Sequence, residues 1–538
     1  MKKINLKQIF AAFMALLLML TILNSCDITD DSKTYEISDF DAFFDRYVAL
    51  LQADALFAWD METGGTAEGA MEARGKTVGI ISAELYDISI SQDMQNFFKT
   101  VEKAMEKGEV DEKTKSIYRI TKSDYDKAMA IPKEEYQAFS EMTTVSYSKW
   151  HEAKEKNDYN IFEPYLQDII DYNRKVIEYR KQAGMEYENP YDALLDDFEP
   201  GLTTKTLDGF FDELRSEILP LLKSIKESNK EIRTDFLQRK IPLSIQKDIS
   251  EFLMKTTGFD MNRGILAESA HPMTIGIGQS DVRITTRYTE NDFAESFYAV
   301  MHESGHAIYE QNVAKELEST ILDTGVSMGI HESQSRFLEN MVGRSYEFWE
   351  AIYDDFQKIT KGHFEDVSAL QFYEALNVVE PSFIRIQADE LTYSLHIMVR
   401  YEIEKEIANN PELTAKDLPG LWDEKMLEYL GITPESYAEG ILQDSHWSFG
   451  EFGYFPTYAI GNAYAAQFTN AMEKDFDLKT AISELDFTVI NNWSTEKIHK
   501  HGSMLQPFEI LSNITDEDFS SKYYIDYLKQ KYTELYGI

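Results

Sequence analysis

The chain contains one cysteine, Cys26, among its 538 residues. A disulfide needs two thiols, so none can form within the chain, and no second thiol is available as a catalytic nucleophile. Positive charge is also scarce, because 53 lysines and arginines face 94 aspartates and glutamates and leave a net charge of −41. This surplus of negative charge disfavours nucleic acids and anionic membrane surfaces as partners.

Proline and glycine are few as well, with 13 and 26 residues. No segment rich in serine, proline or glycine, no low-complexity run and no internal repeat divides residues 40–538. Apolar residues recur at steps of three and four between Leu207 and Ile225, where Pro220 predicts a kink in a helix. We therefore expect a mainly α protein in which residues 40–538 form a single domain, with aromatic residues, 13% of the chain, supplying much of its core.

Long apolar runs are missing except near the N-terminus. Residues 9–23 form an apolar run that follows a basic start containing Lys2, Lys3 and Lys7. About 15 apolar residues are short for a membrane-spanning helix. Because a basic start followed by such a run is typical of an export signal, the sequence predicts a signal peptide over residues 1–25.

Residues 23–26, Leu-Asn-Ser-Cys, resemble a bacterial lipobox, in which the cysteine is lipidated and becomes the first residue of the mature protein. On this resemblance Cys26 carries the lipid, and residues 26–39 form a polar, acidic tether. We expect a bacterial cell-envelope protein whose only membrane contact is its lipid anchor, since two or more acyl chains anchor a protein stably. The membrane face stays open, and a secreted protein without lipid is the alternative.

The most specific pattern in the chain is His302-Glu303-Ser304-Gly305-His306. In a helix, residues four apart project from the same face one turn apart, so both imidazoles can bind one metal ion. Glu303 projects about 100° away from His302. We therefore predict that it does not bind the metal and that its carboxylate is the general base toward a metal-bound water. The alternative is a solvent-exposed helix face without a metal.

The segment around this motif has helical spacing, with apolar residues at positions 293, 297, 300, 301 and 308 and Asn291 as a candidate N-cap. Gly305 inside such a helix costs about 1 kcal/mol relative to alanine. This cost indicates close packing at Gly305, although a tolerated glycine is an alternative.

A catalytic zinc site of this kind has a third protein ligand and keeps one position for water. A second helical pattern begins at Gly329 and carries His331 and Glu332 in its first turn. We predict Glu332 as the third ligand. His331 competes for this role, and a glutamate that only favours the helix dipole is a further alternative.

Together these motifs resemble the carboxypeptidase Taq family, thermostable metallocarboxypeptidases in which HExxH is followed by a His-Glu-Ser-Gln-Ser-Arg segment. Further segments that are similar to family signatures occur in the expected order, namely Asp281-Val-Arg-Ile-Thr-Thr286, Ile384-Arg-Ile-Gln-Ala-Asp389 and Gly440-Ile-Leu-Gln-Asp-Ser-His-Trp447. The resemblance covers residues 40–538. Two segments depart from the family pattern: His271-Pro272-Met273 has methionine in place of phenylalanine, and Gly64-Gly65 stands where the family usually has Met-Pro.

The resemblance implies a large helical zincin-like metallopeptidase with a deep central cleft between two halves. It also implies the ligands His302, His306 and Glu332, the base Glu303, and often a homodimer. The family removes single amino acids from the C-termini of peptides, whereas HExxH alone is equally compatible with endopeptidases and aminopeptidases.

A carboxypeptidase binds the terminal carboxylate of its substrate, a task that suits the planar guanidinium of arginine. Arg385 is the first candidate, followed by Arg283 and Arg400. The developing oxyanion needs a hydrogen-bond donor besides the metal. Candidates for this donor, each with ordinary packing as the alternative, are His271, His446, Tyr454 and Tyr458.

Two further features concern the surroundings of the metal. Asp389 and Asp444 are candidates to hold a metal ligand or the arginine in place, because a ligating imidazole usually donates its other N–H to a carboxylate or carbonyl. Residues 270–288 alternate β-branched with small or polar residues and predict a β-hairpin beside the metal helix. Its edge strand is a candidate for pairing with an extended peptide, or else it only covers the helix.

We therefore expect a metallocarboxypeptidase with one divalent ion. Zn²⁺ is the first choice and Co²⁺ an alternative, since a His₂Glu set accepts several ions. A zincin oligoendopeptidase is the alternative enzyme. An inactive envelope lipoprotein that binds peptide or metal is the non-enzymatic alternative, against which the intact Glu303 argues.

Overall fold

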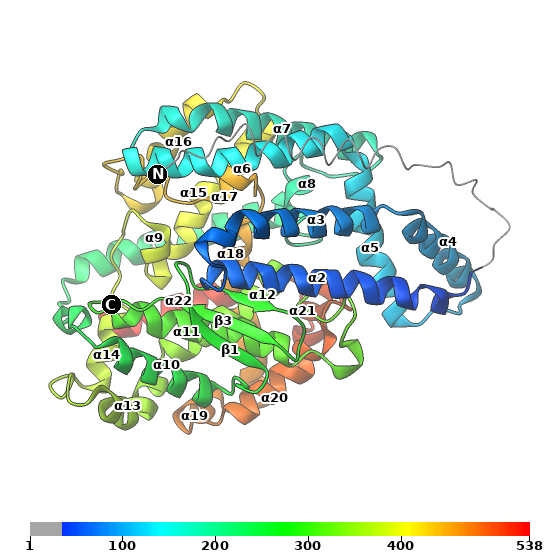
Figure 1. Ribbon diagram of the computed structural model, residues 1–538. Helices are drawn as coiled ribbons and strands as arrows, with labels where there is room; N and C mark the ends of the chain where they lie inside the picture. The colour runs from blue at the N-terminus through cyan, green and yellow to red at the C-terminus, as the bar shows by residue number, and fades with distance from the viewer. Residues whose placement is uncertain (1–34) are drawn as a thin grey trace.

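The computed structural model describes residues 35–538, so Cys26, the predicted signal peptide and most of the predicted tether lie outside the described residues. Helices dominate the described part, which confirms the mainly α prediction (Figure 1). The first helices are α2 (Asp41–Glu62), α3 (Met71–Ser89), α4 (Gln92–Lys107), α5 (Glu112–Ala130), α6 (Lys133–Lys156), α7 (Glu163–Gln182), α8 (Asp192–Leu195), α9 (Thr204–Ser228) and α10 (Leu243–Thr257). None of the helices within residues 35–538 is long and apolar enough to cross a membrane.

A small sheet and the metal-motif helices follow. The strands are β1 (Gly264–Glu268), β2 (Thr274–Gly276) and β3 (Val282–Thr286), and the next helices are α11 (Phe293–Gln311), α12 (Met328–Arg336) and the π-helical η6 (Phe337–Gly343). The remaining helices are α13 (Tyr346–Thr360), α14 (Ala369–Leu376), α15 (Glu390–Asn409), α16 (Leu418–Leu430), α17 (His446–Phe449), α18 (Phe455–Asp475), α19 (Leu478–Ser483), α20 (Phe487–Lys497), α21 (Pro507–Thr515) and α22 (Lys522–Tyr536). Short 3₁₀ turns are η1 (Ile37–Phe40), η2 (Glu68–Ala70), η3 (Tyr159–Ile161), η4 (Asp235–Gln238), η5 (Lys315–Leu317), η7 (Arg385–Gln387), η8 (Ala415–Asp417) and η9 (His499–His501).

The sheet lies between the N-terminal helices and the helices of the metal motif. Its strand order is β1-β3-β2, with β1 parallel and β2 antiparallel to β3. The predicted hairpin is therefore confirmed as β2–β3, in which Thr274 pairs with Ile284, while β1 is an additional strand. Val282 and Ile284 are fully buried, and β3 packs against α11. Because β2 is the last strand in this order, it is an edge strand, and it also packs against α11, the metal helix.

The metal-motif helices are at the centre of the packing. α12 packs between α11 and α18, and α11 also packs against α10. In Figure 1, α6 and α7 lie along the top of the molecule and α10, α13 and α14 along the bottom, with α11, α12 and the sheet between them. The principal hydrophobic core extends in sequence from Trp150 to Tyr536. The motif helices are therefore surrounded by other elements on most sides, which restricts how far their side chains can move.

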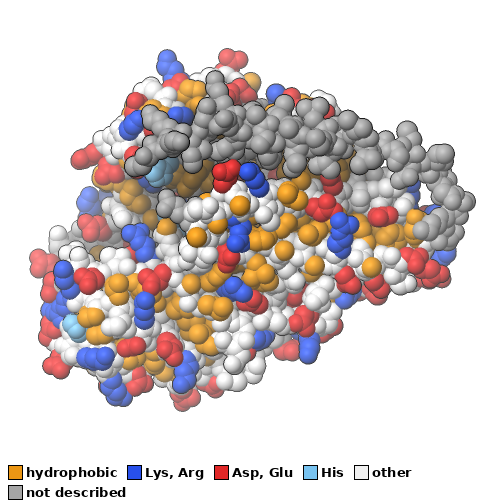
Figure 2. Space-filling view, viewed as in Figure 1, with side chains coloured by type: hydrophobic (Ala, Val, Ile, Leu, Met, Phe, Trp, Pro, Cys, Tyr) orange, Lys and Arg blue, Asp and Glu red, His pale blue; other side chains and the backbone are white. Residues whose placement is uncertain are grey.

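The helical hairpin formed by α2 and α3 lies apart from this principal core. A smaller core of Phe40, Met94, Phe97, Phe98 and Val101 lies beside it. The two helices pack mainly on each other, and Figure 2 shows apolar side chains on the face that they form. Large apolar side chains exposed there are Leu51, Leu56, Met61, Met71 and Ile80. The assignment of residues 40–538 to one domain stays a prediction.

The structure bears on three local expectations from the sequence, at the start of α11, at Pro220 and at Gly64. The N-cap of α11 is Asp292, whose carboxylate accepts a hydrogen bond from Glu295 N, so the prediction of Asn291 was wrong by one residue. Helix α9 continues through Pro220, so the proline does not end the helix, and the kink stays a prediction. Gly64 follows the end of α2 with a φ of +73°, a conformation that glycine adopts without strain, so this departure from the family pattern builds a turn.

Candidate metal centre and active site

Helices α11 and α12 approach each other unusually closely at Gly305. A Cβ at this position would lie 2.4 Å from the backbone oxygen of Gln334 on α12. On the other side of α12, a Cβ at Gly461 of α18 would lie 2.5 Å from Cγ of Glu332. Two glycines therefore allow α12 to pack between α11 and α18, and the close-packing interpretation of Gly305 is correct.

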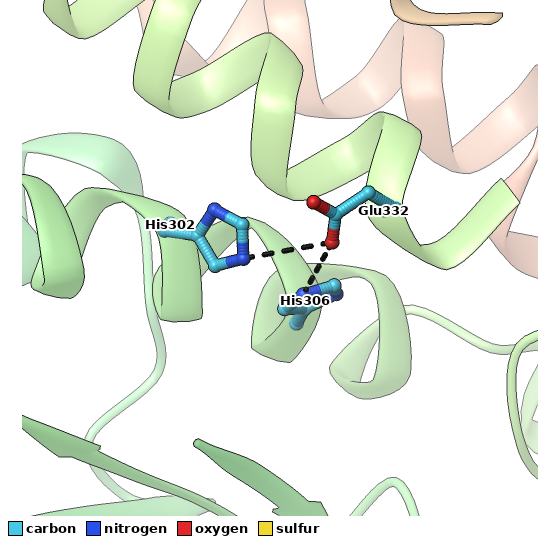
Figure 3. Close-up of side chains that lie close together, drawn as sticks. All are labelled: His302, His306 and Glu332. Atoms are coloured by element: carbon cyan, nitrogen blue, oxygen red, sulfur yellow. Dashed lines mark ion pairs between the residues drawn. The ribbon is translucent and has the colours of Figure 1, made fainter. Parts of the chain in front are cut away.

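This packing brings the three predicted ligands together (Figure 3). Oε2 of Glu332 lies 3.6 Å from Nε2 of His302 and 3.5 Å from Nε2 of His306. Tetrahedral coordination with bonds of about 2.1 Å places ligand atoms about 3.4 Å apart. The three residues form a group that could hold a metal ion, and their spacing fits a tetrahedral site with one position left open.

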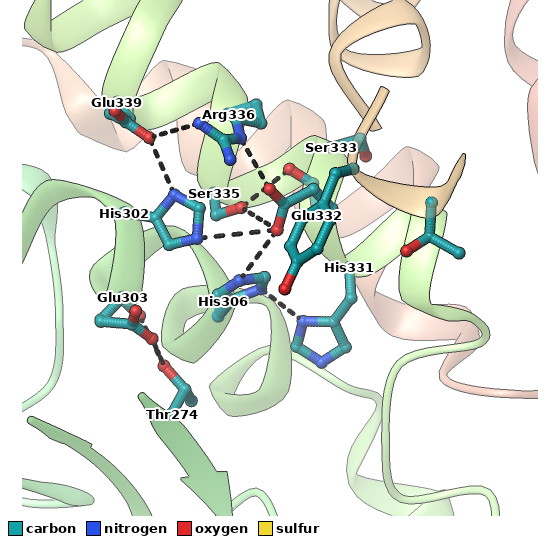
Figure 4. A network of polar contacts seen from close by, with 12 residues as sticks. Thr274, His302, Glu303, His306, His331, Glu332, Ser333, Ser335, Arg336 and Glu339 are labelled. Atoms are coloured by element: carbon teal, nitrogen blue, oxygen red, sulfur yellow. Dashed lines mark hydrogen bonds and ion pairs between the residues drawn. The ribbon is translucent and has the colours of Figure 1, made fainter. Parts of the chain in front are cut away.

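The second nitrogen of each imidazole is held by a further residue (Figure 4). Nδ1 of His302 lies 2.9 Å from Oε2 of Glu339, and Nδ1 of His306 lies 2.8 Å from Nδ1 of His331. Nε2 of His331 in turn lies 2.6 Å from Oε1 of Glu310. If each chain of contacts ends with a proton donated to a carboxylate, both ligand imidazoles present an unprotonated Nε2 toward Glu332.

The same contacts differ between the two candidates for the third ligand. Glu332 faces the Nε2 atoms of both histidines, whereas His331 contacts His306 from behind, through Nδ1. Burial lowers the pKa of His306 to about 4, so its imidazole is neutral and keeps a lone pair for a cation. The geometry therefore favours Glu332 over His331.

The carboxylate of Glu332 is held in its ionised form. Burial alone would raise its pKa, but the Arg336 guanidinium and the two histidines outweigh this effect and hold the pKa well below the usual glutamate value. Nε of Arg336 donates to Oε1 of Glu332 over 2.6 Å, and Oγ of Ser335 donates to Oε2 over 3.3 Å. One oxygen is thus occupied by arginine while the other faces the histidines.

Glu303 points away from the ligands toward the edge strand, as its position on the helix predicts. Its carboxylate accepts a hydrogen bond of 2.7 Å from Oγ1 of Thr274 on β2 (Figure 4). Burial raises the pKa of Glu303, with His302 and Thr274 opposing the effect. A carboxylate with a raised pKa is a better proton acceptor than an ordinary surface glutamate.

These residues lie at the wall of a large cavity of about 910 Å³, which corresponds to the expected cleft. The edge strand contributes Thr274 and Gly276, next to Pro272 and Met273, so the methionine that departs from the family pattern faces the cavity. Residues of α5 and of the 196–200 segment also line the cavity, among them Arg119, Asp124, Lys127, Asp196 and Phe198. The volume is within the range that accommodates a short peptide segment.

The predicted arginines differ in their surroundings. Arg385 and Arg400 both pair with Asp444, over 2.8 Å and 2.5 Å, and Asp444 therefore holds arginines rather than metal ligands. Arg400 is fully buried, and its third donor group is taken by the carbonyl of His396. The Arg385 guanidinium lies 4.8 Å from the ring centre of Tyr458, a residue of the cavity wall.

Arg283 lies in a different environment, on β3. Its guanidinium pairs with Asp281 over 2.7 Å and stacks over the ring of Trp59 on α2. It lies outside the cavity wall formed by the described residues, as do Arg385 and Arg400. Arg283 therefore links the sheet to α2, and among the three arginines Arg385 is the one beside a cavity residue.

Of the predicted oxyanion donors, the structure brings Tyr454 and Tyr458 into the cavity wall. Burial raises the pKa of Tyr454 to about 12, so its hydroxyl stays protonated and can donate. Nε2 of His446 lies 3.3 Å from the hydroxyl of Tyr458, so His446 contacts the cavity through this tyrosine. His271 is exposed and lies outside the cavity wall formed by the described residues.

The second predicted supporting carboxylate has a different role. Asp389 is the N-cap of α15 and accepts hydrogen bonds from the backbone and hydroxyl of Thr392 and from Glu380 N. None of these partners is a metal ligand or an arginine, so the prediction for Asp389 was wrong. An Asp followed three residues later by a threonine at a helix start is a local capping signal, which was available in the sequence.

The residues that contact the predicted ligands and the predicted base were not foreseen. Glu310, Glu339 and Arg336 contact His331, His302 and Glu332, while Thr274 contacts Glu303. Glu310 follows His306 by four residues and Arg336 follows Glu332 by four, so each lies one helical turn beyond a ligand. That spacing was a usable signal, whereas the meeting of Glu339 with His302 depends on how α11 and η6 pack.

Comparison with known proteins identifies the family. The family described as carboxypeptidase Taq (M32) metallopeptidase matches residues 39–532. The chain belongs to this family. Carboxypeptidase 1 of Bacillus subtilis is 42% identical over 504 residues, covering 94% of this chain and 99% of the relative. Thermostable carboxypeptidase 1 of Thermus thermophilus is 36% identical over 502 residues, with coverages of 92% and 98%.

The fold gives the same result. The crystal structure of the M32 carboxypeptidase from Deinococcus radiodurans superposes with a TM-score of 0.88 at 32% identity, covering 93% of this chain and 99% of that one. The zincin-like helical fold predicted from the sequence is thus confirmed. The protein is a metallocarboxypeptidase, a hydrolase that acts on the C-terminal peptide bond of peptides and that depends on a divalent metal ion.

Proposed function

We propose that this M32 carboxypeptidase binds its metal through His302, His306 and Glu332 and uses Glu303 as general base. The observation that supports the ligand set is the convergence of two Nε2 atoms on one carboxylate oxygen, 3.6 and 3.5 Å away. Both imidazoles have a hydrogen-bond partner at Nδ1, so the donor chemistry fits a divalent cation. A divalent ion bound there lowers the pKa of water from 15.7 toward about 7 and polarises the scissile carbonyl.

The chain's own residues handle the protons. Glu303 takes a proton from the attacking water and passes it to the leaving amine, while Thr274 fixes the orientation of its carboxylate. Tyr454 and Tyr458 provide hydroxyl donors for the oxyanion of the substrate. The edge strand β2 is positioned to pair with the backbone of an extended peptide, since Thr274 and Gly276 line the cavity.

Recognition of the terminal carboxylate is assigned to Arg385. Its location behind Tyr458 supports this role, and Asp444 orients its guanidinium from the other side. Arg400 completes the group by holding the second oxygen of Asp444. The Arg385 guanidinium donates to Asp444 through Nε and Nη2 and to the hydroxyl of Tyr393 through Nη1. Since a guanidinium has five N–H donors, it keeps donor capacity for an incoming substrate carboxylate.

Zn²⁺ is the proposed metal, with Co²⁺ as an alternative. Two imidazoles and one carboxylate are a common catalytic zinc set, but the same donors accept other divalent ions. Elemental analysis of protein purified without chelators, followed by reconstitution with each ion, distinguishes the two.

Two further proposals concern the surroundings of the enzyme. The lipobox-like residues 23–26 support lipidation at Cys26 and anchoring in a bacterial cell envelope. Family membership supports a homodimer. If Cys26 carries the lipid, Cys26→Ser should release the protein from the membrane fraction. Light scattering of the purified protein measures its mass and so tests the dimer.

The central experiment compares wild type with Glu303→Gln on a peptide that is blocked at its N-terminus. We expect release of single C-terminal residues by wild type, and a loss of about 10²-fold to 10⁴-fold in turnover for the variant with its metal retained. Glu295→Gln, on the first turn of the same helix and outside the cavity, is the matched control and should keep full activity. Cleavage of a peptide blocked at both ends would instead establish an oligoendopeptidase.

A further inference from the structure

The N-terminus of α12, the helix that carries Glu332, is held by the 196–200 segment, which also lines the cavity. Met328 N donates to the carbonyl of Phe198 over 3.2 Å, and Gly329 N donates to Oε2 of Glu199 over 2.7 Å. Ile330 N donates to Oγ of the N-cap Ser327 over 3.2 Å. The first N–H groups of a helix have no partner within it, and here two of them depend on residues 198–199.

Glu199 itself is fully buried and has no cationic partner in its hydrogen bonds. Besides Gly329 N, it accepts a hydrogen bond of 3.2 Å from the hydroxyl of Tyr464 on α18, and the side chain of Ser327 also bonds to it. Burial raises the pKa of Glu199 to about 7 against the effect of these donors. Burying an acid without a cationic partner is costly, and here the donors at the start of α12, together with Tyr464, offset that cost.

The sequence leaves space for this contact. A Cβ at Gly329 would lie 2.6 Å from Oε2 of Glu199, so a larger residue would push the carboxylate off the helix terminus. Gly461, on the same helix as Tyr464, admits the side chain of Glu332 in the same way. Gly329, which bonds to Glu199, and Glu332 are therefore within one turn of each other on α12. Both contacts involve the same neighbouring helix, α18.

The 196–200 segment also contacts the cavity. Asp196, Asp197, Phe198 and Pro200 line it. The ring of Phe198 packs edge-on against Tyr454, with 5.1 Å between ring centres. A single short segment thus contacts the helix of the third ligand, the tyrosine of the cavity wall and the space that a peptide occupies.

We propose that Glu199 is a positioning residue of the metal centre, which sets the place of Glu332 by capping the N-terminus of α12. The proposal rests on the ligand role of Glu332 given above. A negative charge at a helix N-terminus is favourable in addition to its hydrogen bond, so charge adds to geometry at pH values above the Glu199 pKa of about 7, where the carboxylate is ionised.

The experiment measures the dissociation constant for Zn²⁺ by competition with a chromophoric chelator, using the metal-free full-length protein. Glu199→Ala removes the cap, and we expect binding about tenfold weaker or more, in the range found for residues that support metal ligands indirectly. Glu199→Gln keeps an oxygen for Gly329 N but loses the charge, and at about pH 8, where Glu199 is ionised, we expect binding about threefold weaker. Thermal melts of the metal-free proteins establish that each variant is folded.

The matched control is Glu404, a second fully buried glutamate whose pKa burial also raises to about 7. Its partners are Tyr191, Trp447 and Gly453 N, none of them on α12. Glu404→Gln and Glu404→Ala should lower stability but bind Zn²⁺ as tightly as wild type does. If unpairing any buried donor weakened metal binding, these variants would also bind Zn²⁺ less tightly.

The outcomes separate the two proposals. Wild-type affinity in folded Glu199→Ala overturns the positioning role, as does an equal weakening in the Glu404 variants. If Glu199→Ala does not fold, Glu199→Gln decides, and an affinity equal to wild type then counts against the role. Failure of Glu332→Gln to weaken Zn²⁺ binding would instead overturn the ligand set, whatever the Glu199 variants show.

Discussion

Gly305 is the residue at which the metal site is most sensitive to a single methyl group. In Gly305→Ala the new Cβ would lie 2.4 Å from the backbone oxygen of Gln334 and 2.6 Å from Cα of Ser335. Because backbone atoms cannot rotate away, α11 and α12 must separate. We expect a loss of about 1–3 kcal/mol in unfolding free energy, measured by denaturant titration, together with weaker metal binding.

Gly209 provides the control for that substitution. It also lies inside a helix, α9, but a Cβ there meets nothing within 4 Å. Gly209→Ala should therefore raise stability by up to about 1 kcal/mol through helix propensity alone. If Gly305→Ala and Gly209→Ala changed the unfolding free energy by similar amounts, Gly305 would not be required for the close approach of α11 and α12.

Glu339 is the residue whose effect on the metal should be largest outside the ligands. It accepts from Nδ1 of His302 and also pairs with Arg336 and Arg344. Glu339→Gln removes the charge that orients the imidazole, and we expect a 10-fold to 100-fold loss of metal affinity, read by chelator competition. Glu350→Gln, an exposed site bonded to Tyr346, should bind metal as wild type does.

At the scale of an element, helix α9 contains a proline in its interior. Pro220 lies exposed within Thr204–Ser228, where it lacks an N–H and crowds the preceding turn. Since its ring is not packed in the core, Pro220→Ala should leave no cavity and raise the stability of the protein by up to about 3 kcal/mol, seen as a higher melting temperature. An unchanged or lower melting temperature would show that the proline is needed for the course of α9.

Local pattern was sufficient to predict the elements of the metal site but not their mutual arrangement. The spacing of His302 and His306 gave α11, and alternation around residues 278–281 gave the β2–β3 hairpin. The parallel strand β1 was not predicted, because Gly264 pairs with Val282 although strand β2 lies between them in sequence, and a parallel pair is not joined by a tight turn that the sequence could signal. Likewise Glu339 and Glu199 reach the site through packing between elements, which no periodicity within one helix encodes.

At the scale of the whole molecule, buried carboxylates join the walls of the cleft. Glu199 connects the 196–200 segment to α12, and Glu404 on α15 connects Tyr191 to Trp447 and to Gly453 N. A Cβ at Gly453 would lie 2.5 Å from the carbonyl oxygen of Leu194, so the chain that leads into Tyr454 lies directly on α8. The cavity wall is thus built from residues distant in sequence, and its shape depends on these contacts.

Glu404 should make the stability of the molecule depend on pH in a defined direction. Burial raises its pKa from 4.5 to about 7, opposed by the donors Tyr191 and Trp447 and by the charge of Arg400. The folded protein therefore holds this proton up to about pH 7, whereas the unfolded chain loses it near pH 4.5. The resulting stabilisation is complete below pH 4.5 and is lost as the pH rises to about 7.

Glu404→Gln cannot titrate, so the difference in unfolding free energy between variant and wild type should shift in favour of the variant between pH 5 and pH 8. A factor of ten in proton affinity corresponds to about 1.4 kcal/mol, which puts the shift on the order of a few kcal/mol. Comparing the two proteins at each pH cancels the titration of all other groups, including the metal-site histidines. Parallel pH profiles would show that Glu404 titrates in the folded protein as it does in the unfolded chain, and that its three donors compensate fully for its burial.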